Sequence, residues 1–395
     1  MDAKTNPFSP GAGTKPPELA GRDDLILAAE IGLDRIRSGR SAKSLIFYGL
    51  RGVGKTVLLN RIRQDADNRS FVTFHLEAPE GRSLPGILAP ALRAVLIKLS
   101  RGAAAKDSVT RAMRALAGFV GAFKVKYSDI EVSINVEEEL GLADSKDLDL
   151  DLSDLLSAIG MAALQKKTAV VLFVDEIQYV PESQLASLIV ALHSTSQQGL
   201  PITMVAAGLP QILGQTGRAK SYAERLFQFV HVDKLTEDAA RDALCIPVAD
   251  AGEAISDEAV RAILDATQCY PYFLQEWGKH SWNLADRSPI SKSDVEAATV
   301  EALAELDASF FRVRFDRLTP SERKYLRAMA ELGPGPHRSG DIAVALGRTA
   351  SGVAPTRNSL IRKGMVYSPA HGDTAFTVPL FDAFMKRTIP DLASL

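Results

Sequence analysis

The sequence predicts an α/β protein whose parallel sheet is followed by an all-helical module and by a small C-terminal module of three helices and two short strands. Three observations lead to this expectation. Short apolar runs alternate with helical patterns as far as Leu235, the strand-like runs stop there, and two more short strands flank a turn at Gly372. Continuous apolar strands separated by helices are typical of a parallel sheet covered on both faces.

Composition and charge narrow the class of protein. The chain has 395 residues, of which 46% are hydrophobic and 24% charged, as in ordinary soluble globular proteins. A formal net charge of -2 gives no whole-chain attraction to nucleic acid or membrane, so any basic surface must be local. Two cysteines in dissimilar contexts and an N-terminus without a signal pattern predict a cytoplasmic location, and the apolar runs are too short for a membrane anchor.

The α/β part is expected over residues 18–235, after a leader at 1–17 whose Pro, Gly and small polar residues predict flexibility. A helix at about 22–38 opens this part. The predicted strands lie at 43–48, 71–78, 169–174, 201–207 and 230–235. Between the second and third strands, residues 123–137 alternate apolar and polar side chains around Ser128 and Asp129, which predicts an inserted β-hairpin.

Two further modules follow. Residues 236–316 read as an α-helical lid that begins at the capping residue Thr236, followed by acidic first-turn residues. Residues 317–395 predict a winged helix-turn-helix. Its helices are expected at 321–332, 339–346 and about 351–363, and its strands at 365–368 and 375–378.

The segment GLRGVGKT directly follows the first strand and predicts a phosphate-binding loop. Its glycines let backbone amides converge on a phosphate, Lys55 adds a positive charge, and the Thr56 hydroxyl is a ligand for Mg²⁺. The amphipathic helix that follows adds the positive end of its dipole. The residues expected to hold the nucleotide, ATP or ADP, are Gly49, Leu50, Arg51, Gly52, Val53, Gly54, Lys55, Thr56 and Val57.

A pair of carboxylates ends the third strand, in AVVLFVDEIQYV. Asp175 is expected to complete the Mg²⁺ shell with Thr56, and Glu176 to orient and deprotonate the attacking water. These carboxylates otherwise would be ordinary caps of the next helix, but a phosphate loop in the same sheet favours ATP hydrolysis. The predicted catalytic residues are therefore Glu176 and Lys55.

The pairing of GLRGVGKT with LFVDEIQYV resembles the AAA+ superclass, and the segment ELAGRDDL is similar to an element of its origin-recognition-like and STAND branches. The likeness extends from residue 18 to about residue 390. It implies that the segment at 19–22, with Arg22, helps to enclose the adenine. It also implies that Pro271 lies near the base, although Cys269 stands where the STAND pattern has glycine.

The same resemblance implies an arginine finger in AKSYAERLF, for which Arg225 is the first candidate and Arg218 the second. The alternative is a structural arginine that pairs with Glu224 or caps a helix. One departure from the family concerns the end of the fourth strand, where a polar sensor is usual but residues 206–208 are Ala, Ala and Gly. Slow turnover, as in a switch, is the expectation that follows.

The C-terminal module is locally basic, with ten Lys and Arg against six Asp and Glu between Thr319 and Leu395. Double-stranded DNA is therefore a candidate partner through residues 348–363, because the third helix of a helix-turn-helix enters the major groove. The side chains involved would be Arg348, Arg357, Asn358, Arg362 and Lys363. The alternative is a module that packs back on the nucleotide domain and contacts no DNA.

Two functions are therefore compatible with the sequence. One is an ATP-dependent switch that presents its winged helix to DNA; the other is a signalling or scaffolding ATPase that binds protein partners or forms a homo-oligomer. A metabolic kinase is disfavoured by the Asp175–Glu176 pair and the added module. The acidic run at 144–154 lacks the glycine and final glutamate of a calcium loop, and no pair of histidines has zinc-ligand spacing, so neither metal site is expected.

Overall fold

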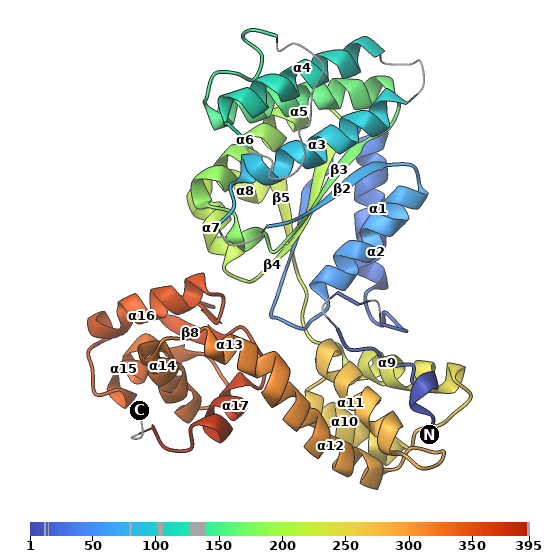
Figure 1. Ribbon diagram of the computed structural model, residues 1–395, viewed down its shortest axis with the longest axis vertical. Helices are drawn as coiled ribbons and strands as arrows, with labels where there is room; N and C mark the ends of the chain where they lie inside the picture. The colour runs from blue at the N-terminus through green and yellow to red at the C-terminus, as the bar shows by residue number, and fades with distance from the viewer. Residues whose placement is uncertain (12, 15, 79–80, 102–105, 126–138, 393–395) are drawn as a thin grey trace.

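The computed structural model describes residues 1–392 except 12, 15, 79–80, 102–105 and 126–138, and so leaves most of the predicted hairpin at 123–137 outside the described residues (Figure 1). An α/β part lies at one end of the molecule, and two groups of helices lie side by side at the other end. Within the described residues, no helix has the length and apolar character needed to cross a bilayer.

Five parallel strands form the central sheet, as predicted. They are β1 (Ser44–Tyr48), β2 (Val72–Glu77), β3 (Val170–Asp175), β4 (Ile202–Gly208) and β5 (Phe227–His231). Their order across the sheet is β2-β3-β4-β1-β5. The central strands β3 and β4 are buried along their whole length because both faces of the sheet are covered, whereas the edge strands β2 and β5 also carry polar, partly exposed residues. The fifth strand begins at Phe227, three residues before the predicted start.

Helices cover both faces of the sheet. Helices α1 (Asp23–Arg37) and α2 (Lys55–Asn68) pack on one face, where Leu45 and Phe47 of β1 are buried. Ile46 points to the opposite face, in accordance with the two-residue period of a strand. That face is covered by α3 (Leu84–Ser100), α4 (Lys106–Ala122), α5 (Leu148–Gln165) and α6 (Glu182–Gln197). Short elements η2 (Ile177–Tyr179), α7 (Ile212–Ala219) and α8 (Ala223–Leu226) complete this part.

The next helices lie in the segment that the sequence predicts as a lid, and we call them the lid. They are α9 (Glu237–Asp250), α10 (Asp257–Thr267), α11 (Pro271–Leu284) and α12 (Lys292–Leu306). The Thr236 hydroxyl accepts a hydrogen bond from the amide of Ala239, as expected of a helix cap. A π-helical turn, η3 (Asp307–Phe311), continues α12 into the short helix α13 (Arg312–Asp316).

We call the last elements the C-terminal unit: α14 (Pro320–Glu331), β6 (His337–Arg338), α15 (Ser339–Ala345), α16 (Ala350–Arg362), β7 (Val366–Tyr367), β8 (Asp373–Phe376) and α17 (Phe381–Thr388). The three strands form an antiparallel sheet in the order β6-β8-β7. Three helices and the β7–β8 hairpin lie where the sequence predicts them, whereas β6 and α17 were not predicted.

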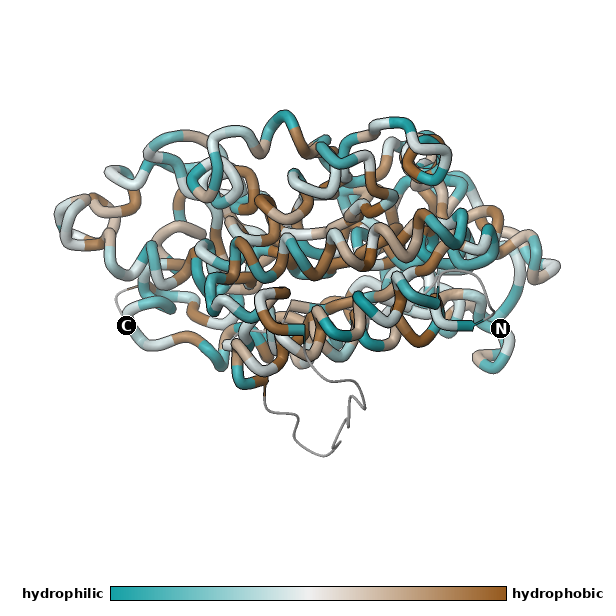
Figure 2. The backbone as a smooth tube through the Cα atoms, turned by 90° about the horizontal axis from the view of Figure 1, so that it is seen from above, coloured by the Kyte–Doolittle hydropathy of each residue, from teal (hydrophilic) through white to brown (hydrophobic). Residues whose placement is uncertain are grey.

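The lid and the C-terminal unit share one hydrophobic core, separate from the two cores of the sheet. Phe311 joins them, because its ring lies 5.2 Å from that of Phe384 and 5.8 Å from that of Phe381. Figure 2 shows hydrophilic and hydrophobic segments alternating along the helices nearest the viewer, as in amphipathic helices with one buried face. The two helical modules are therefore packed together as one body.

The first nine residues of the predicted leader lie against the lid in this structure. Phe8 is buried, and its ring lies against Gly278 of α11. Asn6 donates a hydrogen bond to the carbonyl of Lys279 (3.0 Å), and the indole of Trp282 donates to the carbonyl of Asp2 (2.9 Å). A single aromatic side chain within a Pro- and Gly-rich segment thus fixes this segment on the lid.

Candidate nucleotide site

Residues 49–56 form the phosphate loop, which connects the end of β1 to the start of α2 as predicted. Gly54 has a φ of +88°, in the left-handed region that L-residues with a side chain rarely adopt, and caps the helix. The amides at the N-terminus of α2 therefore point into the loop, where the helix dipole favours an anion.

Lys55 lies inside this loop. Its ammonium donates hydrogen bonds to the carbonyls of Gly49 (2.9 Å) and Leu50 (2.7 Å). Burial lowers the pKa of the Lys55 ammonium to about 8, because a charge is poorly solvated there. A phosphate group would offer this buried cation a much better partner than two carbonyl dipoles.

The two predicted Mg²⁺ ligands are brought together from different parts of the chain. The Thr56 hydroxyl at the start of α2 donates to Oδ2 of Asp175 at the end of β3, at 2.7 Å. A hydroxyl and a carboxylate are hard oxygen ligands of the type that Mg²⁺ binds while it keeps several waters. The residues present therefore fit the ion that the family resemblance implies.

Glu176 follows Asp175 in a left-handed conformation, with a φ of +51°. This conformation is unfavourable for a residue other than Gly, Asn or Asp, and such strain clusters at functional sites. The Glu176 carboxylate accepts a hydrogen bond from Gln178 and forms an ion pair with Arg51 at 3.4 Å. Arg51 also donates to the Tyr179 hydroxyl (2.8 Å), so the candidate general base is held by the phosphate loop itself.

Gln178 places a polar side chain beside the end of β4, where residues 206–208 carry none. Its amide oxygen accepts a hydrogen bond from the backbone of Leu209 (2.9 Å). A Cβ atom at position 208 would lie 2.8 Å from this oxygen, so only glycine leaves room for it. Sequence reasoning missed Gln178 because its contact with β4 joins residues about 30 positions apart.

The residues assigned to the adenine side by resemblance lie around the phosphate loop. Arg22 donates to the carbonyl of Val53 (3.2 Å) and to that of Asp233. Pro271 begins α11, and the amide of the next residue, Tyr272, donates to the carbonyl of Gly52 (3.1 Å). Their contact with adenine stays a prediction. Cys269, which replaces the expected glycine, has a φ of +61°, the conformation that glycine favours.

The candidate arginine fingers lie elsewhere. Arg225 is exposed in α8, just before β5, and the start of β5 pairs with the start of β1. The phosphate loop follows the other end of β1, so Arg225 lies at the opposite edge of the sheet from it. Arg218 forms an ion pair with Glu182 at 3.0 Å. A role for Arg225 in the site of a neighbouring subunit stays a prediction.

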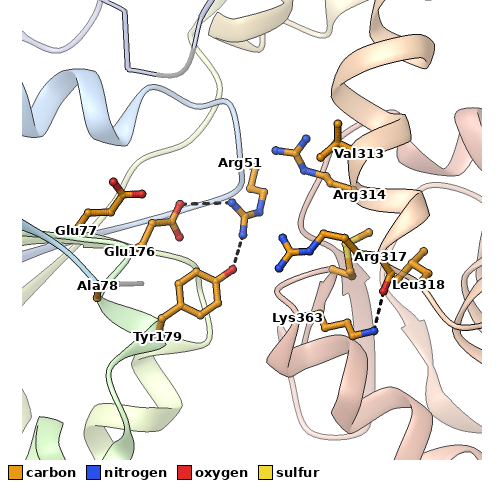
Figure 3. A pocket seen from close by; sticks show the side chains of 11 residues that line it. Arg51, Glu77, Ala78, Glu176, Tyr179, Val313, Arg314, Arg317, Leu318 and Lys363 are labelled. Carbon is orange, nitrogen blue, oxygen red and sulfur yellow. Dashed lines mark hydrogen bonds and ion pairs between the residues drawn. The ribbon is translucent and has the colours of Figure 1, made fainter. Parts of the chain in front are cut away.

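A cavity of about 330 Å³ opens beside Glu176, between the sheet and the C-terminal part of the chain (Figure 3). The sheet side contributes Arg51, Glu77, Ala78, Glu176 and Tyr179, and the facing side Val313, Arg314, Arg317, Leu318, Lys363 and Met365. Four of these side chains carry a positive charge and two a negative charge. The cavity next to the candidate general base is therefore suited to an anion.

Arg314 is the most distinctive of these cations. Its guanidinium lies 4.0 Å from the centre of the Phe310 ring and donates to the Phe310 carbonyl. Among the described residues, it forms no ion pair with a carboxylate. Burial, and next the positive charge of Arg51, lowers the pKa of Arg314 to about 10, so it is charged at neutral pH. No sequence motif marks this residue, which lies outside the α/β part.

The C-terminal unit contacts the phosphate loop directly. The backbone amide of Arg51 donates to the carbonyl of Thr377, just after β8, at 2.9 Å. Nearby, Gln211 donates to the carbonyl of Ile361 near the end of α16 (3.4 Å). The unit is thus docked on the edge of the sheet that carries the phosphate loop, the two predicted Mg²⁺ ligands and Glu176.

One of the predicted DNA contacts, Arg357, is engaged within the C-terminal unit in this structure, and its contact with DNA stays a prediction. The Arg357 guanidinium donates to the Thr374 hydroxyl (2.7 Å), to the Ser368 hydroxyl (2.9 Å) and to the Asp373 carbonyl (2.8 Å). It therefore fastens α16 to the β7–β8 hairpin through Nε and Nη2, and of its five N–H donors only the two on Nη1 are left for base edges.

The other basic side chains of this region differ in exposure. Lys363 pairs with the buried Glu322 at 2.7 Å, which also removes it from a DNA surface. Arg348, Asn358 and Arg362 are exposed. The basic surface that remains is smaller than the sequence predicts.

The lowered pKa of Lys55 predicts how the affinity for MgATP depends on pH. Phosphates stabilise the ammonium, so nucleotide binding above pH 8 must take up a proton that the lysine has lost. Affinity for MgATP should be nearly constant from pH 7 to 8 and about tenfold weaker at pH 9. Titration calorimetry at each pH measures this. Lys55→Arg, whose guanidinium stays charged, should show no such decline; an equal decline in that variant would contradict the assignment.

Comparison with known proteins gives two family matches. Residues 18–205 match a family described as AAA ATPase domain, and residues 308–385 match one described as a domain of unknown function (DUF8462). An uncharacterized HTH-type transcriptional regulator of Methanocaldococcus jannaschii is 23% identical over 214 residues, which are 52% of this chain and 52% of that protein. The chain thus spans about half the length of this curated relative.

One solved structure shows the same fold. A Walker-type ATPase of Pyrococcus abyssi superposes with a TM-score of 0.57 and 15% identity over 94% of this chain and 97% of the other. A looser likeness, with a TM-score of 0.45 and 16% identity, links it to the RuvB Holliday junction branch migration motor of Thermotoga maritima, over 91% and 94% of the two chains. Residues 18–205, just under half of the chain, thus match the AAA ATPase domain family, and the phosphate loop and the parallel sheet of this part agree with that match.

Proposed function

We propose that this protein binds ATP with Mg²⁺, hydrolyses it slowly, and uses the bound nucleotide to set the position of its C-terminal unit. The observation that carries the proposal is the 2.7 Å contact between Thr56 and Asp175, which unites the phosphate loop with the carboxylate end of β3. ATP hydrolysis at such a site depends on positioning and charge stabilisation more than on covalent chemistry.

Each side chain has a distinct role in this proposal. The loop amides and Lys55 hold the phosphates, while Thr56 and Asp175 hold Mg²⁺, which when bound neutralises charge on the phosphate oxygens. Glu176 orients the attacking water and accepts its proton. Because Arg51 pairs with Glu176 in this structure, the carboxylate must be released before it can act on water.

Arg51 also explains how nucleotide could govern the C-terminal unit. Its side chain holds Glu176, and its amide is bonded to the carbonyl of Thr377. A terminal phosphate entering the cavity competes with Glu176 for Arg51 and attracts Arg314 from the opposite wall. We therefore infer that ATP frees the general base and changes the docking of the C-terminal unit in one step.

The C-terminal unit has the elements of a winged helix, and we propose that it contacts double-stranded DNA through exposed basic side chains on α16 and just before it. The local excess of basic residues and the likeness to an HTH-type regulator support this. Arg348 and Arg362 are the expected phosphate contacts, since both are exposed. The end of α16 near Ile361 is docked against Gln211, so undocking would enlarge the DNA surface.

A signalling or scaffolding ATPase without DNA contact is the second candidate. It is favoured by the internal use of Arg357 and Lys363, which leaves few free cations on α16. In that case the C-terminal unit would bind a protein partner, or a neighbouring copy that receives Arg225 at its nucleotide site.

A mobility-shift assay with random-sequence duplex at about 50 mM salt separates the two, because phosphate contacts are strongest at low salt. We expect binding that strengthens with ATP. Replacing Arg348 and Arg362 by Ala should lower the salt dependence by about two counterions. The matched control replaces Arg40 and Lys106, two exposed basic residues of the α/β part, and should bind as wild type does. Equal binding by both double variants, or no binding at all, would favour the second candidate.

A further inference from the structure

A cluster of carboxylates and one imidazole lies in the lid, between α11 and α12. Glu276 and His280 are four residues apart on α11 and therefore project from the same side of this helix. Glu305 approaches them from the end of α12. One ligand atom from each of these three residues lies within 4.8 Å of the others, a separation that a single metal ion spans.

Outer partners hold the three ligands in place. His280 Nε2 lies 2.9 Å from a Glu305 carboxylate oxygen, while its Nδ1 lies 3.5 Å from the Glu301 carboxylate. The Tyr272 hydroxyl donates to Oε1 of Glu276 at 3.0 Å. A histidine whose second nitrogen faces a carboxylate, beside an anchored carboxylate ligand, is the arrangement found around protein-bound metal ions.

The second oxygen of Glu276 is the observation that points to a ligand. Glu276 is 4% exposed, and its Oε2 has no hydrogen-bond partner within the described part of the chain. Its nearest cation is the Lys279 ammonium, at 3.9 Å. Leaving a buried carboxylate oxygen without a hydrogen bond is costly, whereas coordination of a cation would satisfy it.

Lys279 is the alternative cation for this cluster. Its ammonium lies 2.8 Å from each oxygen of Glu305. However, Lys279 pairs with two carboxylates, those of Glu276 and Glu305, and a third carboxylate, Glu301, lies beside His280, so the acidic side chains of the cluster outnumber its one ammonium. The Lys279 side chain is 27% exposed and long enough to turn its ammonium into solvent when another cation enters.

We propose that this cluster binds one divalent transition-metal ion of the zinc class, through Glu276 Oε2, His280 Nε2 and Glu305 Oε2. One imidazole nitrogen with two carboxylate oxygens suits zinc or manganese better than calcium, which takes oxygen ligands only. The sequence does not predict this site, because the site contains only one histidine and because Glu305 comes from a separate helix.

The metal would also fix the lid near the nucleotide site. It would join α11 to α12, and it would hold Glu276, the hydrogen-bond partner of Tyr272. The Tyr272 amide in turn donates to the carbonyl of Gly52 in the phosphate loop. The metal site itself does not depend on ATP binding, so the two proposals fail independently.

The test is titration calorimetry of nucleotide-free, chelator-treated protein with zinc chloride, together with thermal denaturation. We expect one zinc ion per chain and a higher melting temperature. His280→Ala and Glu305→Gln should each weaken binding about 100-fold or more, and Glu301→Gln about 10- to 100-fold. The matched controls His371→Ala and Cys245→Ser, at a histidine and a cysteine outside the cluster, should bind zinc as wild type does.

Lys279→Met separates the metal from the ammonium. If the cluster is a metal site, this variant binds zinc at least as tightly as wild type, because it loses a competing cation. If Lys279 is the natural partner of the cluster, the variant is destabilised and zinc does not restore its melting temperature. That result, no zinc binding by wild type, or wild-type affinity in His280→Ala would each overturn the proposal.

Discussion

Lys55→Ala should abolish measurable ATP binding and leave the fold intact. The ammonium is buried in the phosphate loop, and its only hydrogen-bond acceptors among the described residues are the carbonyls of Gly49 and Leu50. Removing one partner of a buried charge pair typically costs about 2–5 kcal/mol of binding energy, which is about 30-fold or more in affinity. Titration calorimetry with MgATP measures the loss.

The thermal stability of the Lys55→Ala variant should not fall together with its ATP affinity. Burial already disfavours the charged form of Lys55, as its lowered pKa shows, so the side chain is placed at a cost to the empty protein. The thermal midpoint of Lys55→Ala without nucleotide should therefore equal or exceed that of wild type. Lys292→Ala, which removes an exposed lysine of α12, is the matched control and should bind ATP normally. Undiminished affinity in Lys55→Ala would reject the site.

The parts of this site that the sequence predicts lie in short, contiguous segments of the chain. The phosphate loop lies between a strand and a helix that the adjoining residues predict. Asp175 ends a strand of continuous apolar residues. Because carboxyl ends of parallel strands meet at one edge, the contact of Thr56 with Asp175 follows from topology once the sheet is predicted.

The missed parts are contacts between distant segments. Nothing near Arg51 in the sequence indicates that Thr377, more than 300 residues later, would accept its amide hydrogen bond. Arg314 likewise lies in the cavity beside Glu176. It does so because the π-helical turn η3 and the core shared by the lid and the C-terminal unit place α13 next to the sheet. These contacts depend on how two packed bodies meet, and hydrophobic periodicity within each body does not determine that.

Two residues, Arg357 and Phe8, form tertiary contacts that the neighbouring sequence does not indicate. A basic residue on the third helix of a helix-turn-helix favours a DNA contact, but the Arg357 guanidinium satisfies polar groups of the hairpin beside it. Phe8 stands in a segment rich in Pro and Gly, yet its side chain is buried against Gly278 of the lid, and this burial favours the packing of the segment there. In both cases a tertiary partner overrides what the neighbouring residues favour.

Glu176→Gln should keep ATP binding but lose hydrolysis. The amide has the size of the carboxylate and still accepts a hydrogen bond from Gln178, but it cannot take a proton from water. General-base catalysis is commonly worth about 10²- to 10⁴-fold, and we expect turnover to fall by that factor. Single-turnover release of labelled phosphate measures it.

ATP affinity of Glu176→Gln should stay equal to that of wild type or increase, because the variant also breaks the ion pair with Arg51 and leaves this cation free for the nucleotide. Glu182→Gln is the matched control: it removes an exposed carboxylate that pairs with Arg218 outside the site, and its turnover should be unchanged. Should Glu176→Gln hydrolyse ATP within twofold of the wild-type rate, another group activates the water. Glu77, the second carboxylate in the cavity beside Glu176, would then be the residue to replace.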